Sequence, residues 1–157
     1  MAELKLEILQ GPPFASLEEE ALLNLLRASD CLNRALHRKT RPWGVSSTQY
    51  NVLRILRGAH PNGLTCAAIG SRMITAEPDI TRLLARLKAL KLIRQQRDSQ
   101  DRRVLWTHIS EAGLVLLREM DPVIEAVPKE LLARLSLTEL TELIRLLKLT
   151  RCGCQES

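Results

Sequence analysis

One hairpin signal in an otherwise helical chain most limits what this sequence can fold into. Residues 92–94 and 104–109 form two short runs, the second rich in β-forming side chains, and a charged segment separates them. Segments with apolar residues at helical spacing lie before and after this hairpin. We therefore expect a mainly α (α+β) fold with one small hairpin.

Three serine-initiated segments predict where helices begin. Ser16, Ser46 and Ser136 are each followed three residues later by Glu or Gln, the spacing at which the two residues satisfy each other's backbone amides. The expected helices span about 16–40, 46–58 and 136–150. A further long helix is expected over 111–135, its regularity interrupted by Pro122 and Pro128.

Two shorter helices are expected between residue 61 and the hairpin. Thr65 is the predicted N-cap of a helix that ends near Met73. The next helix is predicted to begin near Glu77, with Pro78 in its first turn, and to end near Leu90. Helices followed by a hairpin over 46–109 are the order of a winged helix-turn-helix.

The outer helices carry leucine stripes too wide for one helix to bury alone. We expect them to pack against each other and against a second copy of the chain. The predicted organisation is an N-terminal arm and dimerisation helix (1–40), a winged helix-turn-helix (41–110), C-terminal dimerisation helices (111–150) and a flexible tail (151–157).

Positive charge gathers in the middle of the chain. The net charge is +5, and the window 72–103 holds nine basic residues against four acidic ones. Such a surface suits a polyanion, because phosphates supply most of the sequence-independent affinity for DNA. The alternative is an ordinary solvated face.

Other classes of protein find little support. The chain has only four aromatic residues, which disfavours single-strand or RNA binding by stacking. No apolar run reaches the ~18 residues of a membrane span, and the N-terminus lacks a secretion signal, so we expect a cytoplasmic protein. No catalytic, cofactor or metal motif stands out, which predicts a protein that is not an enzyme.

The helix before the hairpin is the predicted DNA-reading helix, because the second helix of a helix-turn-helix lies in the major groove. Arg82 suits guanine through its paired donors, and Asp79 could accept a hydrogen bond from cytosine or pair with an arginine. The predicted DNA contacts on and before this helix are Thr65, Asp79, Thr81, Arg82 and Arg86.

The hairpin tip holds three arginines and two aspartates. Asp98 and Asp101 reduce the repulsion among the arginines, and one aspartate–arginine pair can hold the loop in shape. The arginines left unpaired can enter a minor groove or contact phosphate.

These residues resemble the MarR family of transcriptional regulators. The wing and the start of the following helix match in 92–94 (LIR), 98–103 (DSQDRR), Leu105 and 109–113 (ISEAG). Upstream, 47–53 (STQYNVL), 63–65 (GLT) and 80–87 (ITRLLARL) are similar to the family's helix-turn-helix.

The resemblance implies a homodimer, joined by its terminal helices, that acts as a repressor on palindromic double-stranded operator DNA. By this analogy Thr81 and Arg82 read the major groove, and either Arg102 or Arg97 reaches the minor groove. Arg103 is then the more structural arginine, paired with Asp98 or Asp101, although the roles of the arginines could be exchanged.

Two positions depart from the family pattern. Lys91 stands where the family usually has glycine, which costs about 1 kcal/mol if the backbone there is left-handed. Glu77 and Asp79 place acid at the front of the reading helix, where it favours the helix dipole but opposes phosphate. These departures bear on operator affinity and not on the fold.

The resemblance also implies control by a small phenolic or anionic effector, or by cysteine oxidation. The candidate ligand-binding residues near the join of the first two helices are His37, Arg41, Trp43 and Tyr50, for which core or linker packing is the alternative. The candidate redox or metal-binding residues are Cys31, Cys152 and Cys154.

Two alternative functions stay open on sequence grounds. The first is a thiol-based sensor of oxidants or metals with the same fold. The second is a winged-helix module for protein interaction that no longer binds DNA, an interpretation that the acidic front of the helix favours and the arginine-rich hairpin opposes.

Overall fold

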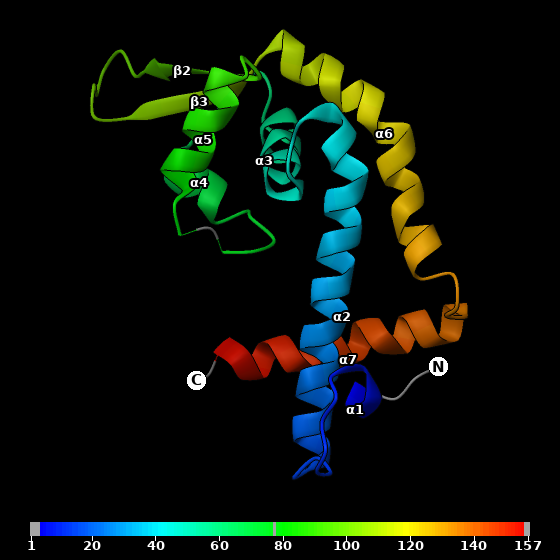
Figure 1. The fold of residues 1–157 in the computed structure, drawn as a ribbon. Helices are drawn as coiled ribbons and strands as arrows, with labels where there is room; N and C mark the ends of the chain where they lie inside the picture. Colours follow the sequence, from blue (N-terminus) through cyan, green and yellow to red (C-terminus); the bar gives the residue numbers. More distant parts are fainter. Residues whose placement is uncertain (1–3, 77, 156–157) are drawn as a thin grey trace. The chain divides into compact units, whose positions relative to one another are not determined.

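The computed structural model describes the backbone of residues 4–76 and 78–155, and the side chains of these ranges up to residue 153. The chain divides into two compact units, Met1–Asp121 and Pro122–Ser157. The first unit contains the predicted winged helix-turn-helix together with the N-terminal helices (Figure 1). The mainly helical fold with one small sheet is confirmed.

The N-terminal part of the first unit holds a short helix and a long one. Helix α1 (Leu4–Glu7) was not predicted, whereas α2 (Leu17–Thr40) lies where its capping signal placed it. The Ser16 hydroxyl accepts the amide of Glu19 at 3.2 Å. The Glu19 carboxylate accepts from the amide of Ala15 at 2.6 Å instead of that of Ser16, so the predicted cap is only half formed.

The predicted capping box of α3 (Ser47–Gly58) is confirmed. The Ser46 hydroxyl accepts the Gln49 amide at 3.1 Å, and the Gln49 side-chain oxygen accepts the Ser46 amide at 2.8 Å. A short 3₁₀ helix, η1 (Arg41–Trp43), joins α2 to this cap. Helices α2 and α3 contact each other within the first unit.

Helix α4 (Cys66–Gly70) begins at its predicted N-cap, Thr65, but it ends before the predicted Met73. The predicted start of the next helix is wrong, because α5 (Ile80–Ala89) begins only after a turn that contains Pro78. The Asp79 carboxylate accepts the Arg82 amide at 2.9 Å and thereby caps the helix. Glu77 lies outside the described residues.

The sheet has three antiparallel strands in the order β1–β3–β2. Strands β2 (Ile93–Arg97) and β3 (Leu105–Ile109) form the predicted hairpin. Strand β1 (Leu64–Thr65) was not predicted, because two residues are too few to show the alternation of a strand. It pairs with β3 and so joins the hairpin to the turn before α4.

The core of the first unit is apolar and well buried. Its least exposed apolar side chains come from α3, α4, α5 and α6, and they are Val52, Leu53, Leu56, Ile69, Leu84, Leu87, Leu117 and Met120. On α5 the burial of Leu83, Leu84 and Leu87 leaves the opposite side of the helix exposed to solvent. The core therefore decides which face of α5 is available for binding.

The C-terminal part of the chain contains two helices. Helix α6 (Glu111–Leu131) continues through Pro122 and Pro128, so the two prolines do not break it, and it ends before the predicted residue 135. Helix α7 (Leu137–Gln155) begins at the predicted capping box, in which Ser136 and Glu139 bond to each other's amides. It also continues into the segment 151–157, for which a flexible tail was expected.

Within the described ranges, none of the helices is both long and apolar enough to cross a membrane.

Candidate nucleic-acid interface

The exposed face of α5 carries three of the predicted DNA contacts. Thr81, Arg82 and Arg86 are all exposed, since the leucines of the same helix take the buried side. Asp79 is also exposed, but its carboxylate accepts the Arg82 amide as the helix cap. The acid at the front of this helix therefore stabilises the helix itself.

Arg82 and Arg86 border a hollow of about 270 Å³ that also reaches the first turn of α3. The hollow is lined by Ser46, Thr48, Asp79, Arg82, Leu83 and Arg86. Two arginines thus line a hollow that also includes the N-cap of α3, where the helix dipole is positive, and Asp79 is the acidic member of the lining. This part of the surface suits an anion such as phosphate.

Thr65, a predicted DNA contact, also has its predicted structural role as an N-cap. Its hydroxyl accepts the amide of Ala68 at 3.3 Å as the N-cap of α4, and its backbone pairs with Trp106 of β3. The side chain is only partly exposed. A contact with DNA through this residue has to use the remaining hydrogen-bonding capacity of its hydroxyl.

The wing, which we define as the hairpin 93–109, ends in a loop of residues 98–104. The last strand pair joins Arg97 to Leu105. Beyond this pair the Asp98 amide donates to the Val104 carbonyl and the Val104 amide donates to the Asp101 carbonyl, each at 2.9 Å. The backbone of the wing loop is therefore closed by its own hydrogen bonds.

Asp98 holds the wing loop through both oxygens of its carboxylate. One oxygen, Oδ1, accepts the amides of Gln100 at 2.8 Å and Asp101 at 3.0 Å, and Oδ2 accepts the indole N–H of Trp106 at 2.9 Å. The Asp101 amide, followed by the Trp106 indole and the Gln100 amide, lowers the pKa of Asp98 below its usual value. The hydrogen bonds of the loop thus favour the charged form of Asp98.

The three loop arginines have different surroundings. Arg97 donates from Nη1 to the Arg102 carbonyl at 2.7 Å, and Arg103 pairs with Asp101 at 3.5 Å. The Arg103 side chain is 95% exposed, so this ion pair contributes little to stability. Arg102 is exposed, and its guanidinium makes no hydrogen bond or ion pair with any residue that the structure describes.

These contacts distinguish the roles of the loop arginines, which the sequence did not assign. Arg97 was a candidate for reaching DNA, yet its guanidinium is used to hold the loop backbone. Trp106 was not predicted as part of the site, because its link to Asp98 spans eight residues and depends on the strand register. Arg102 is left as the arginine that extends from the loop without a partner among the described residues.

The predicted ligand-binding residues lie around the junction of α2, η1 and α3. His37 is exposed in the last turn of α2, and Arg41 and Trp43 form part of η1. Tyr50 is buried, and the guanidinium of Arg54 lies 5.9 Å from the centre of its ring. Tyr50 therefore contributes to packing, whether or not it also contacts a ligand.

Cys31 and Cys152, the predicted cysteines whose side chains are described, do not lie near other metal ligands within that part of the chain. Cys31 is exposed on α2, where Arg34 donates to its sulfur at 3.9 Å, and Cys152 is exposed on α7. The side chain of Cys154 lies outside the described part of the chain. Among the side chains that are described, no three histidines, cysteines or acidic residues form a group able to hold a metal ion.

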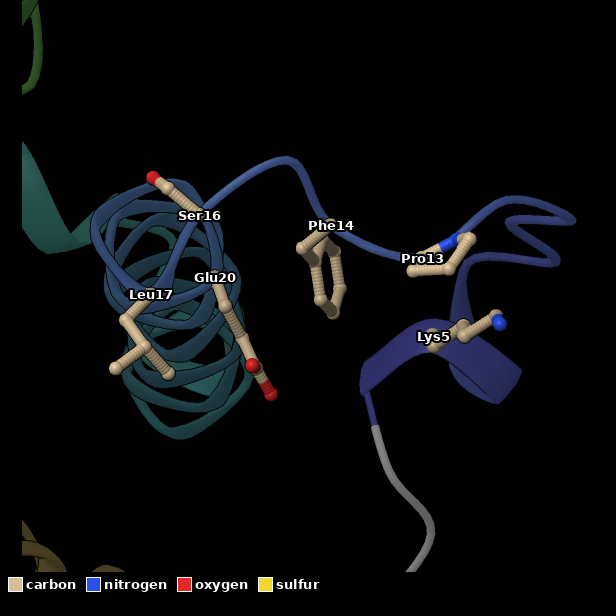
Figure 2. A pocket seen from close by; sticks show the side chains of 6 residues that line it. All are labelled: Lys5, Pro13, Phe14, Ser16, Leu17 and Glu20. Atoms are coloured by element: carbon tan, nitrogen blue, oxygen red, sulfur yellow. The ribbon is translucent and has the colours of Figure 1, made fainter.

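A separate hollow of about 500 Å³ lies at the N-terminal arm, between α1 and the start of α2 (Figure 2). Its lining residues are Lys5, Pro13, Phe14, Ser16, Leu17 and Glu20. The Phe14 ring stands between the segment that carries Lys5 and the helix that carries Glu20 (Figure 2). With one basic and one acidic residue in the lining, this hollow has no preference for a polyanion.

Comparison with known proteins agrees with the geometry of the wing and of α5. The family model described as "MarR family" matches residues 43–104. The chain is 27% identical over 124 residues to the HTH-type transcriptional regulator MhqR of Bacillus subtilis (strain 168), a match that covers 79% of this chain and 84% of that protein.

Solved structures with a similar fold were also found. The fold is similar to that of BpsR from Bordetella bronchiseptica, whose DNA binding is regulated by 6-hydroxynicotinic acid (TM-score 0.74, 22% identity, 85% of this chain and 99% of that one). It is also similar to a MarR transcription factor from Planctomyces limnophilus, with a TM-score of 0.68 and 37% identity, covering 87% of this chain and 99% of that one. The chain belongs to the MarR family of transcriptional regulators.

Proposed function

We propose that this protein is a homodimeric repressor that binds a palindromic operator and is released from it by a small-molecule ligand. The observation that carries the proposal is a pair of arginine-bearing elements in the first unit. Arg82 and Arg86 are exposed on α5, and Arg102 is exposed on the wing loop without a partner among the described residues. Exposed guanidinium groups on two such elements suit a polyanion that offers both grooves and phosphates.

Each element has a distinct task in this proposal. Helix α5 enters the major groove, where Arg82 donates to guanine and Thr81 contacts a neighbouring base. Arg86, about one turn further along α5, contacts phosphate. Arg102 enters the minor groove or contacts its phosphates, while Arg97 and Asp98 keep the loop in shape.

Exposed apolar residues on the terminal helices support a homodimer. On α2, Leu22 and Leu26 are 56% and 58% exposed, and on α7 Ile144 and Leu149 are 54% and 58% exposed. Burial of apolar surface favours association by about 25 cal/mol per Å². A second copy supplies matching stripes by two-fold symmetry, and such a dimer reads half-sites about one turn of DNA apart.

A small aromatic acid or phenol is the effector class we propose. The regulation of BpsR by 6-hydroxynicotinic acid supports this class, because that protein shares the fold. In this chain Arg41 offers a cation for a carboxylate or phenolate, and Trp43 offers an aromatic face. His37 and Tyr50 complete the candidate set.

Control by a thiol is the second candidate. Cys31 is exposed, and the Arg34 guanidinium lies 3.9 Å from its sulfur. An exposed thiol is open to attack by oxidants and soft metals. The exposed Cys152 and the neighbouring Cys154 are further candidates for this route.

A DNA titration tests the proposal. The reduced full-length protein is titrated into the DNA upstream of its own gene and into a shuffled duplex of equal length, at several salt concentrations. Sequence-specific binding that weakens with salt is expected. Equal binding to both duplexes, or none, contradicts the proposed function and favours the protein-interaction module.

Two arginine variants test the assigned tasks. Arg102→Ala should weaken binding to all duplexes and lower the salt slope by about 1, whereas Arg82→Ala should relax base preference at a cost of ~1–3 kcal/mol. Arg151→Ala removes the same charge from an exposed position on α7 and is the control. If Arg102→Ala behaves like Arg151→Ala, Arg102 does not reach DNA.

Two further variants separate the routes of release. Under ligand control, phenolic acids release the DNA from wild type and from Cys31→Ser alike, and Arg41→Ala loses this response. Under thiol control, peroxide releases the DNA from wild type but not from Cys31→Ser. A protein that responds to neither compound class is not released by either proposed route.

A further inference from the structure

We propose that Trp106 is a positioning residue for DNA binding, which presents Arg102 to the DNA by holding Asp98. This inference rests on the proposed DNA-binding function and adds a residue to it. The indole N–H of Trp106 donates to Asp98 Oδ2 at 2.9 Å, and this contact joins strand β3 to the first residue of the wing loop.

The strand register places Trp106 on the outer face of the wing. Trp106 pairs with Gln96, and the next strand residue, Thr107, is 1% exposed on the face toward the core. Trp106 itself is only partly buried, and a hollow of about 240 Å³ lies beside it. The ring is therefore not required to fill the core, which leaves its hydrogen bond as the contact that needs a tryptophan.

Asp98, held by the indole, in turn orders the backbone of the loop. While Oδ2 is held by the indole, Oδ1 accepts the amides of Gln100 and Asp101. These two residues directly precede Arg102. Fixing the rotation of the carboxylate therefore fixes the two peptide groups from which Arg102 extends.

A second contact holds the other side of Arg102. The guanidinium of Arg97 donates to the Arg102 carbonyl at 2.7 Å. Arg102 is thus fixed on both sides. The amide of Asp101, which precedes it, donates to Asp98, and the carbonyl of Arg102 itself accepts from Arg97. A loop ordered in this way before binding loses less conformational entropy when its arginine enters a groove.

Trp106→Phe is the informative substitution, because it keeps an aromatic ring and removes the N–H donor. The probe is a 30-base-pair duplex selected from a randomised pool by the full-length wild-type protein. We expect Trp106→Phe to bind this duplex about fivefold more weakly, because a loop that is less ordered before binding loses more conformational entropy when Arg102 enters a groove. Gln95→Met is the matched control, because it removes a wing hydrogen bond, to the Thr107 hydroxyl, that does not touch the loop, and it should leave the affinity unchanged.

A double-mutant cycle tests whether Trp106 acts through Asp98. In an Asp98→Ala background, Trp106→Phe should cause no further loss of affinity. A loss of the same size in both backgrounds would mean that the ring acts by another route and would overturn the proposal. Unchanged affinity of Trp106→Phe in the wild-type background would overturn it as well.

Amide exchange provides a readout that does not need DNA. The amides of Gln100 and Asp101 should exchange several-fold faster in Trp106→Phe than in wild type. Equal exchange rates would refute the role of Trp106 in ordering the loop. If the wild-type protein selects no duplex at all, the proposed DNA-binding function fails, and the exchange measurement still tests the link between Trp106 and the loop.

Discussion

Replacing Lys91 by glycine is expected to stabilise the protein. Lys91 follows α5 and has a φ of 59°, in the left-handed region. Its amide donates to the Lys88 carbonyl at 2.9 Å, and the Leu92 amide donates to the Leu87 carbonyl at 3.1 Å. This is the Schellman arrangement that ends a helix, and its left-handed position usually holds glycine because glycine has no Cβ.

The magnitude follows from two opposing terms. A left-handed backbone costs an L residue about 1–2 kcal/mol. Glycine gives the unfolded chain more freedom, which costs about 0.4–1 kcal/mol. The Lys91 side chain is exposed and forms no hydrogen bond or ion pair within the described ranges, so its removal loses no such contact. The free energy of unfolding should rise by about 0.5–1 kcal/mol, which raises Tm by about 1–4 °C.

Urea and thermal unfolding at equal protein concentration measure this change, because the stability of a dimer depends on its concentration. Lys91→Ala is the matched control, since it removes the same charge and keeps the Cβ. It should leave the free energy of unfolding nearly unchanged. A decrease in stability for Lys91→Gly would refute the strain argument, and an equal gain for Lys91→Ala would assign the effect to the removed charge.

Three further predictions concern the first unit. Gly113→Ala should lower the free energy of unfolding by about 2 kcal/mol, measured in urea, because the added Cβ meets the Leu92 carbonyl oxygen. Asp121→Asn should lower it by about 1–2 kcal/mol in the same assay, because the partly buried Arg57 guanidinium, now 2.7 Å from the carboxylate, loses a charged acceptor. The pKa of Asp98 is lowered from its ordinary value of 3.8. Asp98 therefore orders the loop fully when the pH is above 3.8, and this contribution is lost as the pH falls through the lowered pKa. The hydrogen bonds from the Gln100 and Asp101 amides to this carboxylate should therefore be lost only at acidic pH, and their loss between about pH 5 and 7 would contradict this assignment.

Much of the fold could be predicted from residues that are close in sequence. The caps at Ser46 and Ser136 each involve a partner three residues away, and both form where predicted. The start of α5 shows the limit of such reasoning. Pro78 is compatible with a first helical turn, but the Asp79 carboxylate captures the amide of Arg82 and places the helix start after itself. Spacing alone did not show which of the two signals would prevail.

A mostly helical chain, the start of most helices and the charged hairpin could all be predicted from residues that are neighbours in the sequence. These properties depend on caps and periodicities that involve residues within about four positions of one another. The roles of three wing residues depend instead on the folded hairpin: Arg97 bonds to the loop backbone, Trp106 bonds to Asp98, and Arg102 has no partner among the described residues. Several residues of both signs compete in the wing loop, and strand register and side-chain geometry select the pairs that form.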